Sequence, residues 1–438
     1  MGRDQDKMSI ITALCKRRGF IFQSSEIYGG LNSCWDYGPL GVELKRNIKE
    51  AWWKSMVFNR SDITGLDASI LMSPKVWEAS GHLSGFTDPM ADCKECRSRF
   101  KTDDLDDPGK CPKCGGELSE PRSFNLMFKT FLGPVEDSSA EVFLRPETAQ
   151  GIFVNFNNVQ QSSRMKPPFG IAQIGKSFRN EITPGNFTYR TREFEQMEME
   201  FFVYPGTDSE WYDYWKNQRF EWYRKFGIKD ENLRLREHEQ DELAHYAKGC
   251  VDVEYQFPFG WSELEGIANR TDYDLKKHSE ASGKNLSVFD DEKNEHYVPY
   301  VIEPAAGVDR TALAFITDAY DVEGSGKKKR TVMRFHPSIA PIKAAVLPLV
   351  KRDGMPEFAR KIYNDLLSNS LNSFIDINSS IGRRYARQDE AGTPYCITVD
   401  GDTMEDGTVT VRERDTREQN RIPSENVVSF IKEQLDIG

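Results

Sequence analysis

Two short motifs decide how this chain can be interpreted: Phe178-Arg179-Asn180-Glu181 and Gly307-Val308-Asp309-Arg310. Arginine keeps its charge at every physiological pH, and its planar guanidinium group pairs bidentately with phosphate oxygens. Two arginines that are distant in sequence but face one pocket are what a bent triphosphate needs. Either motif alone is weak evidence because such patterns occur by chance. Their order, spacing and surroundings make them informative together.

Between and around these motifs, residues 140–310 hold carboxylates in distinctive contexts. Glu198 and Glu200 follow Phe194 on a predicted strand and share a face, because side chains alternate along a strand. Buried carboxylates are costly without partners, so several aimed at one pocket would bind Mg²⁺ or an ammonium group. The alternative for any single glutamate is a strand residue that faces solvent. The set is Glu147, Glu195, Glu198, Glu200, Glu263, Glu265 and Glu303.

Four of the eight cysteines fall in one window as two Cys-x-x-Cys pairs with fourteen residues between them. The spacing is close to that of a zinc ribbon, and disulfides are the poorer explanation inside a cell. We predict a structural Zn²⁺ site with no open coordination position, so the metal does no chemistry. Its ligands are Cys93, Cys96, Cys111 and Cys114. The other four cysteines, Cys15, Cys34, Cys250 and Cys396, are interpreted as packing residues.

The remaining pattern predicts alternating helices and strands. Residues 39–58 are a predicted helix with apolar residues at helical spacing, and residues 63–71 are a predicted strand. A long helix leading into a strand is a dimerisation device in some enzymes and an ordinary αβ unit in others, and both interpretations stay open. The cysteine window, residues 85–125, is an inserted lobe. Further strands are predicted at 141–145, 169–174, 194–204 and 297–303, and helices at 207–250 and 311–320.

Around residues 325–334, Gly324 and Gly326 precede a run of lysines, and this composition predicts a linker between two domains. Beyond it the chain alternates between helices and strands over about a hundred residues, which indicates a compact α/β domain. Strands are predicted at 343–348, near Phe374, at 395–399 and at 408–413, and helices at 355–369, 381–390 and 425–435. Because this domain holds none of the motifs above, it is interpreted as a recognition module.

Charge and hydropathy exclude some functions. The chain has 58 basic and 69 acidic residues, a formal charge of −11, which argues against loose, field-driven binding of nucleic acid. It does not argue against a partner held by local patches, and Lys327-Lys328-Lys329-Arg330 is either such a patch or a solvated loop. No apolar run approaches the ~18–20 residues of a membrane helix, and the N-terminus lacks the apolar core of a secretory signal. We therefore expect a cytoplasmic protein with no membrane partner.

Several longer stretches carry a family resemblance. The chain resembles the class II aminoacyl-tRNA synthetases, and within them the homodimeric glycyl-tRNA synthetase family, over nearly its whole length. The HIGH and KMSKS signatures of class I synthetases are absent. The stretches concerned are Tyr28-Gly29-Gly30 with residues 36–41, then residues 144–153, 178–202, 266–274 and 303–310.

The resemblance implies an α+β catalytic domain in which helices flank an antiparallel sheet, followed by a C-terminal α/β anticodon-binding domain. The implied bounds are 1–335 for the catalytic domain, 85–125 for the zinc-ribbon-like insertion within it, and 340–438 for the anticodon-binding domain. Residues 39–74 then become the first class II motif, which forms the dimer interface.

The resemblance also implies residue roles, with Arg179, Arg310 and Glu181 as catalytic residues. Arg179 is expected to hold the α-phosphate of ATP and Arg310 the γ-phosphate, while Phe194 stacks on adenine. The implied ATP-binding residues are Arg179, Asn180, Glu181, Tyr189, Arg190, Thr191, Arg192, Glu193, Phe194, Glu263, Leu264, Gly307, Val308, Asp309 and Arg310. The implied glycine-binding residues are Glu147, Glu198 and Glu303 around the ammonium group, with Arg99, Phe194, Glu195, Gln196, Met197, Arg270, Pro304, Ala305, Ala306 and Gly307.

The implied activity is ATP-dependent activation of glycine to glycyl-adenylate and its transfer to the 3′ end of tRNA(Gly). The implied cofactors are Mg²⁺ at the phosphates and a structural Zn²⁺, and the implied partners are glycine, tRNA(Gly) and a second copy of the chain. This sequence departs from the family at Ala305, where many relatives have serine, and at Phe100-Lys101-Thr102-Asp103, where the family has Phe-Arg-Ala-Asp. The alternatives are a class II synthetase for another small amino acid and a non-catalytic paralogue that binds tRNA.

Overall fold

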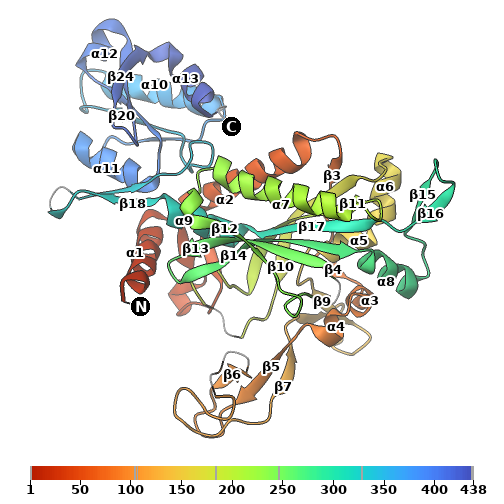
Figure 1. Ribbon diagram of the computed structural model, residues 1–438. Coiled ribbons are helices and arrows are strands. Elements are labelled where there is room, and N and C mark those ends of the chain that lie inside the picture. The colour runs from red at the N-terminus through yellow and green to blue at the C-terminus, as the bar shows by residue number, and fades with distance from the viewer. Residues whose placement is uncertain are drawn as a thin grey trace.

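The computed structural model describes residues 2–102, 105, 107–182, 185–244, 247–326 and 329–435. Lys327 and Lys328 of the basic run, and Asp103 of the departing motif, lie outside the described residues. In Figure 1 the larger, N-terminal domain occupies the centre, the C-terminal domain lies at the upper left, and an insertion built on β5 (Thr87–Asp92), β6 (Arg99–Lys101) and β7 (Arg122–Asn125) projects below.

A seven-stranded sheet forms the centre of the larger, N-terminal domain. Its strand order is β12-β13-β14-β17-β11-β10-β3, and every pair is antiparallel except β10 with β3. The predicted antiparallel sheet is therefore confirmed. The bounds are β3 Ile63–Gly65, β10 Phe169–Phe178, β11 Glu193–Val203, β12 Leu233–Glu237, β13 Gly249–Phe257, β14 Gly260–Thr271 and β17 Tyr300–Gly307.

Three helices cover one face of this sheet: α2 (Pro39–Trp53), α7 (Asp208–Lys225) and α9 (Val308–Ala319) (Figure 1). The odd-numbered residues of β11, such as Met197 and Met199, face these helices and are fully buried. The even-numbered residues therefore face the opposite side. The predicted helix at 39–58 is confirmed, with its last turn, Lys54–Phe58, wound as a π-helix.

Smaller elements surround the sheet. On its other face lie α5 (Ala149–Val154) and α6 (Phe156–Ser163), which share an apolar cluster with Phe169 and Phe202. Further helices and strands of the N-terminal domain are α1 Gly2–Arg18, β1 Ile21–Gln23, β2 Trp35–Tyr37, β4 Leu71–Met72, α3 Pro74–Ala79, α4 His82–Gly85, β8 Lys129–Phe131, β9 Glu141–Leu144, α8 Tyr273–Ser282, β15 Val288–Asp290 and β16 Glu295–Tyr297.

The insertion is a three-stranded sheet with its own small core. Its strands are β5 (Thr87–Asp92), β6 (Arg99–Lys101) and β7 (Arg122–Asn125), in the order β6-β5-β7. The core contains Cys93 and Cys111 with Ala91 and Leu118. So small a core buries little apolar surface, which is the situation in which a metal commonly stabilises a lobe.

The C-terminal domain is a five-stranded sheet of order β21-β20-β22-β23-β24 with helices around it, as the alternation predicted. Two elements, α12 and β24, were missed by the prediction. The bounds are β20 Ala344–Pro348, α10 Met355–Ser368, β21 Ser373–Ile375, α11 Ile381–Ala391, β22 Tyr395–Val399, α12 Gly401–Asp406, β23 Thr408–Glu413, β24 Gln419–Pro423 and α13 Val427–Leu435.

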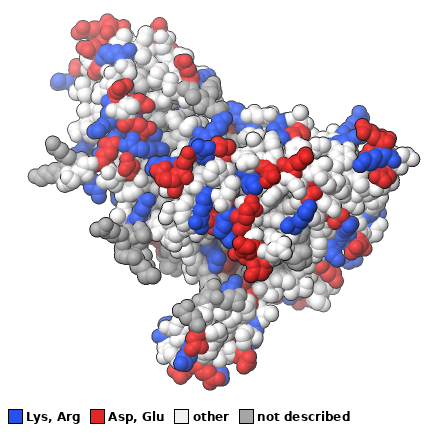
Figure 2. All heavy atoms as spheres, in the orientation of Figure 1, with Lys and Arg blue, Asp and Glu red and all other residues white. Residues whose placement is uncertain are grey.

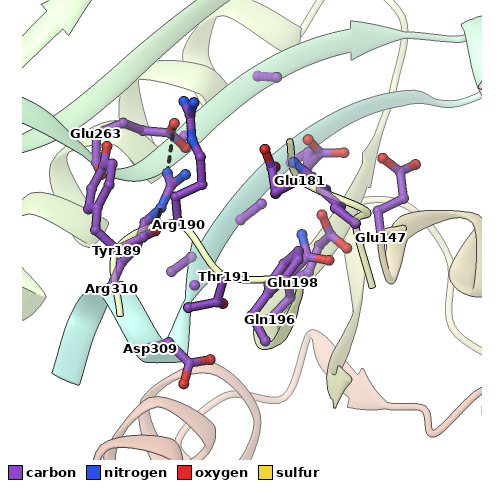
Figure 3. A pocket seen from close by; sticks show the side chains of 18 of the residues that line it. Glu147, Glu181, Tyr189, Arg190, Thr191, Gln196, Glu198, Glu263, Asp309 and Arg310 are labelled. Carbon is purple, nitrogen blue, oxygen red and sulfur yellow. Dashed lines mark hydrogen bonds and ion pairs between the residues drawn. The ribbon is translucent and has the colours of Figure 1, made fainter. Parts of the chain in front are cut away.

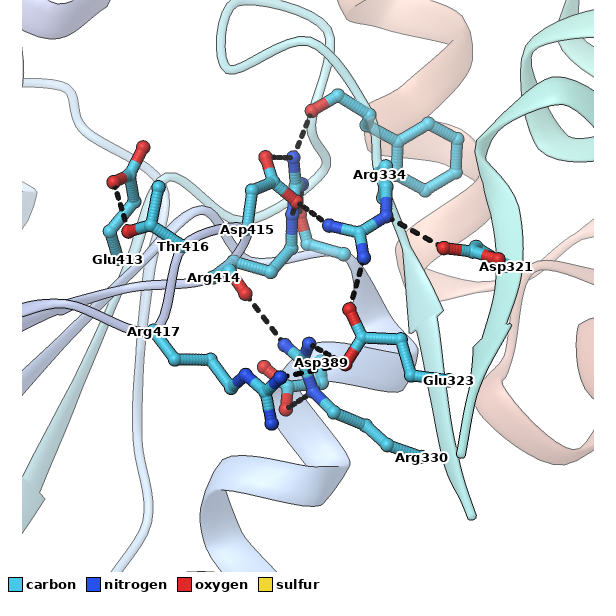
Figure 4. Close-up of polar contacts among 12 residues, drawn as sticks. Asp321, Glu323, Arg330, Arg334, Asp389, Glu413, Arg414, Asp415, Thr416 and Arg417 are labelled. Atoms are coloured by element: carbon cyan, nitrogen blue, oxygen red, sulfur yellow. Dashed lines mark hydrogen bonds and ion pairs between the residues drawn. The ribbon is translucent and has the colours of Figure 1, made fainter. Parts of the chain in front are cut away.

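The predicted linker at 325–334 is wrong in part, because residues 330–333 form strand β19 (Arg330–Met333), which pairs antiparallel with β18 (Tyr320–Glu323). Figure 4 shows the ion pairs that join this hairpin to the C-terminal domain. Arg330 Nε lies 2.7 Å from Asp389 Oδ2, and Arg334 Nη1 lies 2.8 Å from Asp415 Oδ1. The junction between the domains is thus a structured contact.

Two other predictions were wrong in extent. Residues 63–71 contain the separate strands β3 and β4 in two different sheets, and helical character in 207–250 ends at Lys225, after which β12 and the start of β13 follow. Within the described ranges, none of the helices has the length and apolar character needed to cross a membrane. Acidic and basic side chains are interspersed on the face drawn in Figure 2.

Candidate active site

A pocket of about 270 Å³ lies on the face of the central sheet opposite α2 and α9. Strands β11, β14 and β17 form its floor, the turn after β10 supplies Arg179, and residues 188–191 form one wall. It is lined by Glu147, Arg179, Glu181, Thr188, Tyr189, Arg190, Thr191, Phe194, Gln196, Glu198, Cys250, Glu263, Gly266, Ala268, Arg270, Glu303, Ala305, Ala306, Gly307, Asp309 and Arg310.

The strand period explains why these residues meet. Phe194, Gln196 and Glu198 alternate with side chains that face the helices, so all three project from β11 into the pocket. Glu198 pairs with Ala305 on β17, and Glu303 on the same strand pairs with Ala268 on β14. The register of three strands therefore brings residues 100 positions apart to one surface.

One part of the pocket, the arginine end, contains Tyr189, Arg190, Glu263 and Arg310 (Figure 3). Arg310 Nη1 lies 2.9 Å from Glu263 Oε2, and Arg310 Nε donates to the Tyr189 carbonyl oxygen at 3.1 Å. The Arg310 guanidinium also stacks 4.5 Å from the centre of the Tyr189 ring. Arg310 lowers the pKa of Glu263, an effect that exceeds the opposing one of burial.

Arg179 lies beside Phe194, with its guanidinium 5.3 Å from the centre of that ring and 5.4 Å from the ring of Phe86. Its Nε donates to the Pro146 carbonyl oxygen at 3.0 Å, which fixes the orientation of the side chain. Among the described residues no carboxylate forms an ion pair with Arg179 or Arg190. Their charges are therefore available to an anionic ligand.

The opposite part, the glutamate end, is built from Glu147, Glu198, Glu303 and Arg270; Figure 3 shows Glu147 and Glu198 there. Glu147 Oε2 lies 3.2 Å from His82 Nε2, and Glu198 accepts a hydrogen bond from the Thr148 hydroxyl. Arg270 Nη1 lies 2.6 Å from Glu303 Oε2. Carboxylates thus outnumber the basic groups they meet.

The pKa values at the glutamate end diverge. Burial raises the pKa of Glu198 to about 8, helped by the negative charges of Glu303 and Glu147. Burial also raises the pKa of Glu147, but its contacts with His82, Arg270 and Gln150 outweigh burial and leave it below the ordinary value. Burial raises the pKa of Glu303, against the opposing effect of Arg270. Divergent carboxyl pKa values in one cleft mark a functional site.

Arg270 is held by Asp274 as well as Glu303, with Nε 2.8 Å from Asp274 Oδ2. Asp274 in turn accepts from Gln150 Nε2 at 3.1 Å, and Gln150 donates to Glu147 at 3.0 Å. These contacts lock the side chains of the glutamate end before any ligand arrives.

Asp309 connects the second arginine motif to α2. Its Oδ1 accepts from the Tyr37 hydroxyl at 2.7 Å and from Lys45 Nζ at 3.0 Å, and its Oδ2 accepts from the Glu195 backbone at 2.9 Å. These contacts fix the first turn of α9, from which Arg310 projects into the pocket.

The structure brings most of the predicted site residues together and leaves others outside. Glu195 pairs with Lys45 at 2.7 Å on the opposite face of β11. Arg99 lies in the insertion, where it is paired with Asp92 at 2.7 Å and is not brought to the pocket. The predicted residues that do not line the pocket are Arg99, Asn180, Arg192, Glu193, Glu195, Met197, Leu264, Pro304 and Val308.

Four lining residues were missed: Thr188, Cys250, Gly266 and Ala268. Gly266 and Ala268 share the pocket face of β14 with Arg270 because they lie four and two positions before it. That alternation could have predicted both. Cys250 comes from β13, and only the strand order brings it there.

The four clustered cysteines converge in the insertion. Their sulfur atoms all lie within 4.8 Å of one another, with Sγ–Sγ distances of 3.5 Å for Cys93 and Cys114 and 3.6 Å for Cys96 and Cys111. Tetrahedral coordination with Zn–S bonds of ~2.3 Å places sulfurs about 3.8 Å apart. The donor set and its spacing therefore fit Zn²⁺, and all eight cysteines are free thiols.

Comparison with known protein families identifies the class of protein to which this chain belongs. Residues 131–320 match the family described as "tRNA synthetase class II core domain (G, H, P, S and T)", and residues 343–434 match "Anticodon binding domain". A solved structure of prolyl-tRNA synthetase from Cryptosporidium parvum, complexed with L-proline and AMP, superimposes with a TM-score of 0.65 at 14% identity. The superposition covers 97% of this chain and 77% of the prolyl-tRNA synthetase chain. The fold is that of a class II aminoacyl-tRNA synthetase.

Sequence relatives narrow the class. A glycine–tRNA ligase of Treponema denticola is 57% identical over 98% of this chain and 97% of the relative. A glycine–tRNA ligase of Clostridium acetobutylicum is 55% identical over 99% of this chain and 100% of the relative. The chain belongs to the glycine–tRNA ligase family.

Proposed function

We propose that this chain activates glycine with ATP and transfers it to the 3′ end of tRNA(Gly). The observation that carries the proposal is a single pocket with an arginine end and a glutamate end. That pocket lies in the core of a chain 57% identical to a glycine–tRNA ligase. Arginines suit a triphosphate, and surplus carboxylates suit the ammonium group of an amino acid.

ATP occupies the arginine end in this proposal. Arg179 holds the α-phosphate and Arg310 the γ-phosphate, while adenine stacks on Phe194, which lies beside Arg179. The Arg310–Glu263 pair changes when the nucleotide binds, because Arg310 then turns its charge to the phosphate. Thr188 and Tyr189 form the wall beside the nucleotide.

Glycine occupies the glutamate end, with its ammonium group among Glu147, Glu198 and Glu303. Arg270 stands beside them and faces the substrate carboxylate. Glycine has no side chain, so steric overlap with the walls rejects larger amino acids without a separate editing reaction.

The reaction then has two steps. A carboxylate oxygen of glycine attacks the α-phosphorus of ATP in line, the bond from that phosphorus to the bridging oxygen breaks, and pyrophosphate leaves. The 3′-hydroxyl of the terminal adenosine next attacks the carbonyl carbon of the adenylate, and AMP leaves. No side chain acts as a nucleophile, so positioning and charge stabilisation by Arg179 and Arg310 supply the rate.

Metals enter this proposal in two places. Class II synthetases use ATP with Mg²⁺. Glu263 is the pocket carboxylate that would hold Mg²⁺, which neutralises phosphate charge when bound.

The four-cysteine cluster would hold a structural Zn²⁺. Replacing Cys111 by serine should abolish the protein-bound zinc and increase proteolysis of the insertion, whereas Cys34→Ser, outside the cluster, should change neither.

Membership of the glycine–tRNA ligase family also supports proposals for the domain bounds, the localisation and the oligomeric state. We propose a catalytic domain at residues 1–335, with the insertion at 85–125 inside it, and an anticodon-binding domain at residues 340–438.

We also propose that the protein is a cytoplasmic homodimer. Ile27, Tyr28 and Phe58 are 88%, 87% and 74% exposed, and such apolar groups support burial against a second copy. Light scattering that gave the mass of one chain would contradict the dimer.

Charging of tRNA(Gly) tests the activity. The protein should attach glycine, and neither serine nor alanine, to a tRNA(Gly) transcript in the presence of ATP and Mg²⁺. Charging with serine but not glycine would assign the chain to another small amino acid. Binding of the transcript without charging by any amino acid would indicate a non-catalytic paralogue.

A further inference from the structure

Glu200 is a buried carboxyl group for which the proposed reaction gives no role. It lies on β11, two positions after Glu198, and therefore on the same face of the strand. Its side chain is fully buried and does not line the pocket. Among the described residues no donor makes a hydrogen bond to either of its carboxyl oxygens.

The sheet register places Glu200 directly across from Glu303. Strand β11 pairs Glu198 with Ala305 and Phe201 with Ile302, and the same register sets Glu200 opposite Glu303. Residues directly opposite in an antiparallel pair have Cβ atoms about 4.5–5.5 Å apart. In agreement with this, one oxygen each from Glu198, Glu200 and Glu303 lie within 4.8 Å of one another.

An ionised Glu200 does not fit this position. A buried carboxylate that accepts no hydrogen bond is strongly disfavoured, and a neighbouring carboxylate adds repulsion. A protonated Glu200 has an O–H group to donate, and the Glu303 carboxylate is an acceptor within reach. Burial first, and then the charge of Glu303, raise the pKa of Glu200 well above its ordinary value.

Glu303 benefits from such a donor. Arg270 already holds its Oε2 at 2.6 Å, but burial opposes its ionisation. A hydrogen bond from Glu200 acts in the same direction as Arg270 and lowers the pKa of Glu303. A metal ion among the three glutamates is the weaker interpretation, because the Arg270 guanidinium already supplies the positive charge beside Glu303.

We propose that Glu200 is a positioning residue for the ammonium site: it carries a proton, donates it in a hydrogen bond to Glu303, and keeps that carboxylate ionised and directed at the substrate. The inference rests on the proposed function, because it assigns the ammonium group of glycine to Glu303. Glu200 itself does not contact the substrate.

Two substitutions test whether Glu200 acts by donating a hydrogen bond, rather than through its charge or its bulk. Glu200→Gln keeps the size and supplies an N–H donor in place of the O–H, so the KM for glycine should stay within about threefold of the unsubstituted protein. Glu200→Leu keeps the bulk but has no donor, so the KM for glycine should rise by about tenfold or more. The KM for ATP should change in neither variant, as measured by ATP–pyrophosphate exchange.

The infrared spectrum tests the proton directly and does not depend on activity. The unsubstituted protein should show the carbonyl-stretching band of a protonated carboxyl group that Glu200→Gln lacks, and bands from Glu198 cancel in the difference. Absence of this band would overturn the proposal even if Glu200→Leu failed to fold. Equal KM values for the Gln and Leu variants would overturn it as well. If the unsubstituted protein showed no glycine-dependent exchange, the proposed function would fail, while the band would still decide the state of Glu200.

Discussion

The two ends of the pocket solve opposite electrostatic problems. At the arginine end Arg310 has one carboxylate partner, Glu263, and Arg179 is held by a carbonyl oxygen and two aromatic rings. At the glutamate end three carboxylates share the pocket with Arg270. One end has surplus positive charge and the other surplus negative charge.

The contrast in charge indicates which kind of ligand each end of the pocket accepts. An unpaired buried charge is costly, so a protein keeps one only where a ligand completes it. In the proposed function, phosphate binds to the surplus arginines and an ammonium group binds to the surplus glutamates. If that is correct, substitutions at one end should alter the affinity for one substrate and leave the other nearly unchanged.

The largest effect should come from Arg179→Ala. Removing a cation that stabilises charge developing at the α-phosphate should reduce ATP–pyrophosphate exchange by about 10²–10³-fold. Binding of tRNA, measured by filter retention, should be nearly unchanged. Arg224→Ala, at an exposed arginine of α7, is the matched control and should retain full exchange. Full exchange by Arg179→Ala would remove the phosphate role.

At the other end, Glu147→Gln removes a charge and keeps the shape. The KM for glycine should rise by about 10- to 100-fold, because a hydrogen bond to a charged group is worth ~1.5–3 kcal/mol. The KM for ATP should stay constant, and exposed Glu231→Gln should change neither constant. A rise in the KM for ATP alone would show that the two ends are not separable.

The affinity for glycine should also depend on pH. The pKa of Glu198 is raised to about 8, so the empty pocket holds a proton there at pH 7 that an ammonium group must displace. The KM for glycine should therefore fall as pH rises, by roughly tenfold between about pH 7 and 8.5, as the ionised fraction increases. Glu198→Gln should flatten this profile. A flat profile in the unsubstituted protein would contradict the shared proton.

The smallest effect concerns Ala305, which lines the pocket opposite Glu198 on β17. Ala305→Ser introduces the hydroxyl group that the family resemblance implies at this position and should lower the KM for glycine by about threefold, the value of one neutral hydrogen bond. Ala305→Val, which adds bulk without a hydroxyl, should raise it. A serine variant with weaker glycine affinity would show that no hydrogen bond forms there.

Much of the fold followed from local patterns, and the exceptions have physical causes. The helix that begins at Pro39 and the α/β alternation after Lys343 have clear periodicity and were predicted correctly. The stretch after Lys225 keeps aromatic and charged residues but pairs with β13, so sheet context overrides local propensity. Gly324 and Gly326 follow β18 with positive φ angles, and composition alone does not distinguish such glycines from those of a linker.

The site was predicted where motifs and strand alternation agreed. Phe194, Gln196 and Glu198 line the pocket, whereas Glu195 and Met197, taken from the same motif, face away because a strand presents only alternate residues to one side. Cys250 depends on strand order, which local sequence does not encode. Arg99 was carried over from the family resemblance, and the insertion holds it outside the pocket.

The claim that one end accepts ammonium while the other accepts phosphate is tested most directly by ATP–pyrophosphate exchange with three acids. Glycine, alanine and glycolic acid differ from one another by a methyl group or by a hydroxyl in place of the ammonium group. We predict exchange with glycine, and at least about 10²-fold less with either analogue, since both lose a charged contact or clash with the wall. Exchange with glycolic acid at the rate of glycine would contradict the role of Glu147, Glu198 and Glu303.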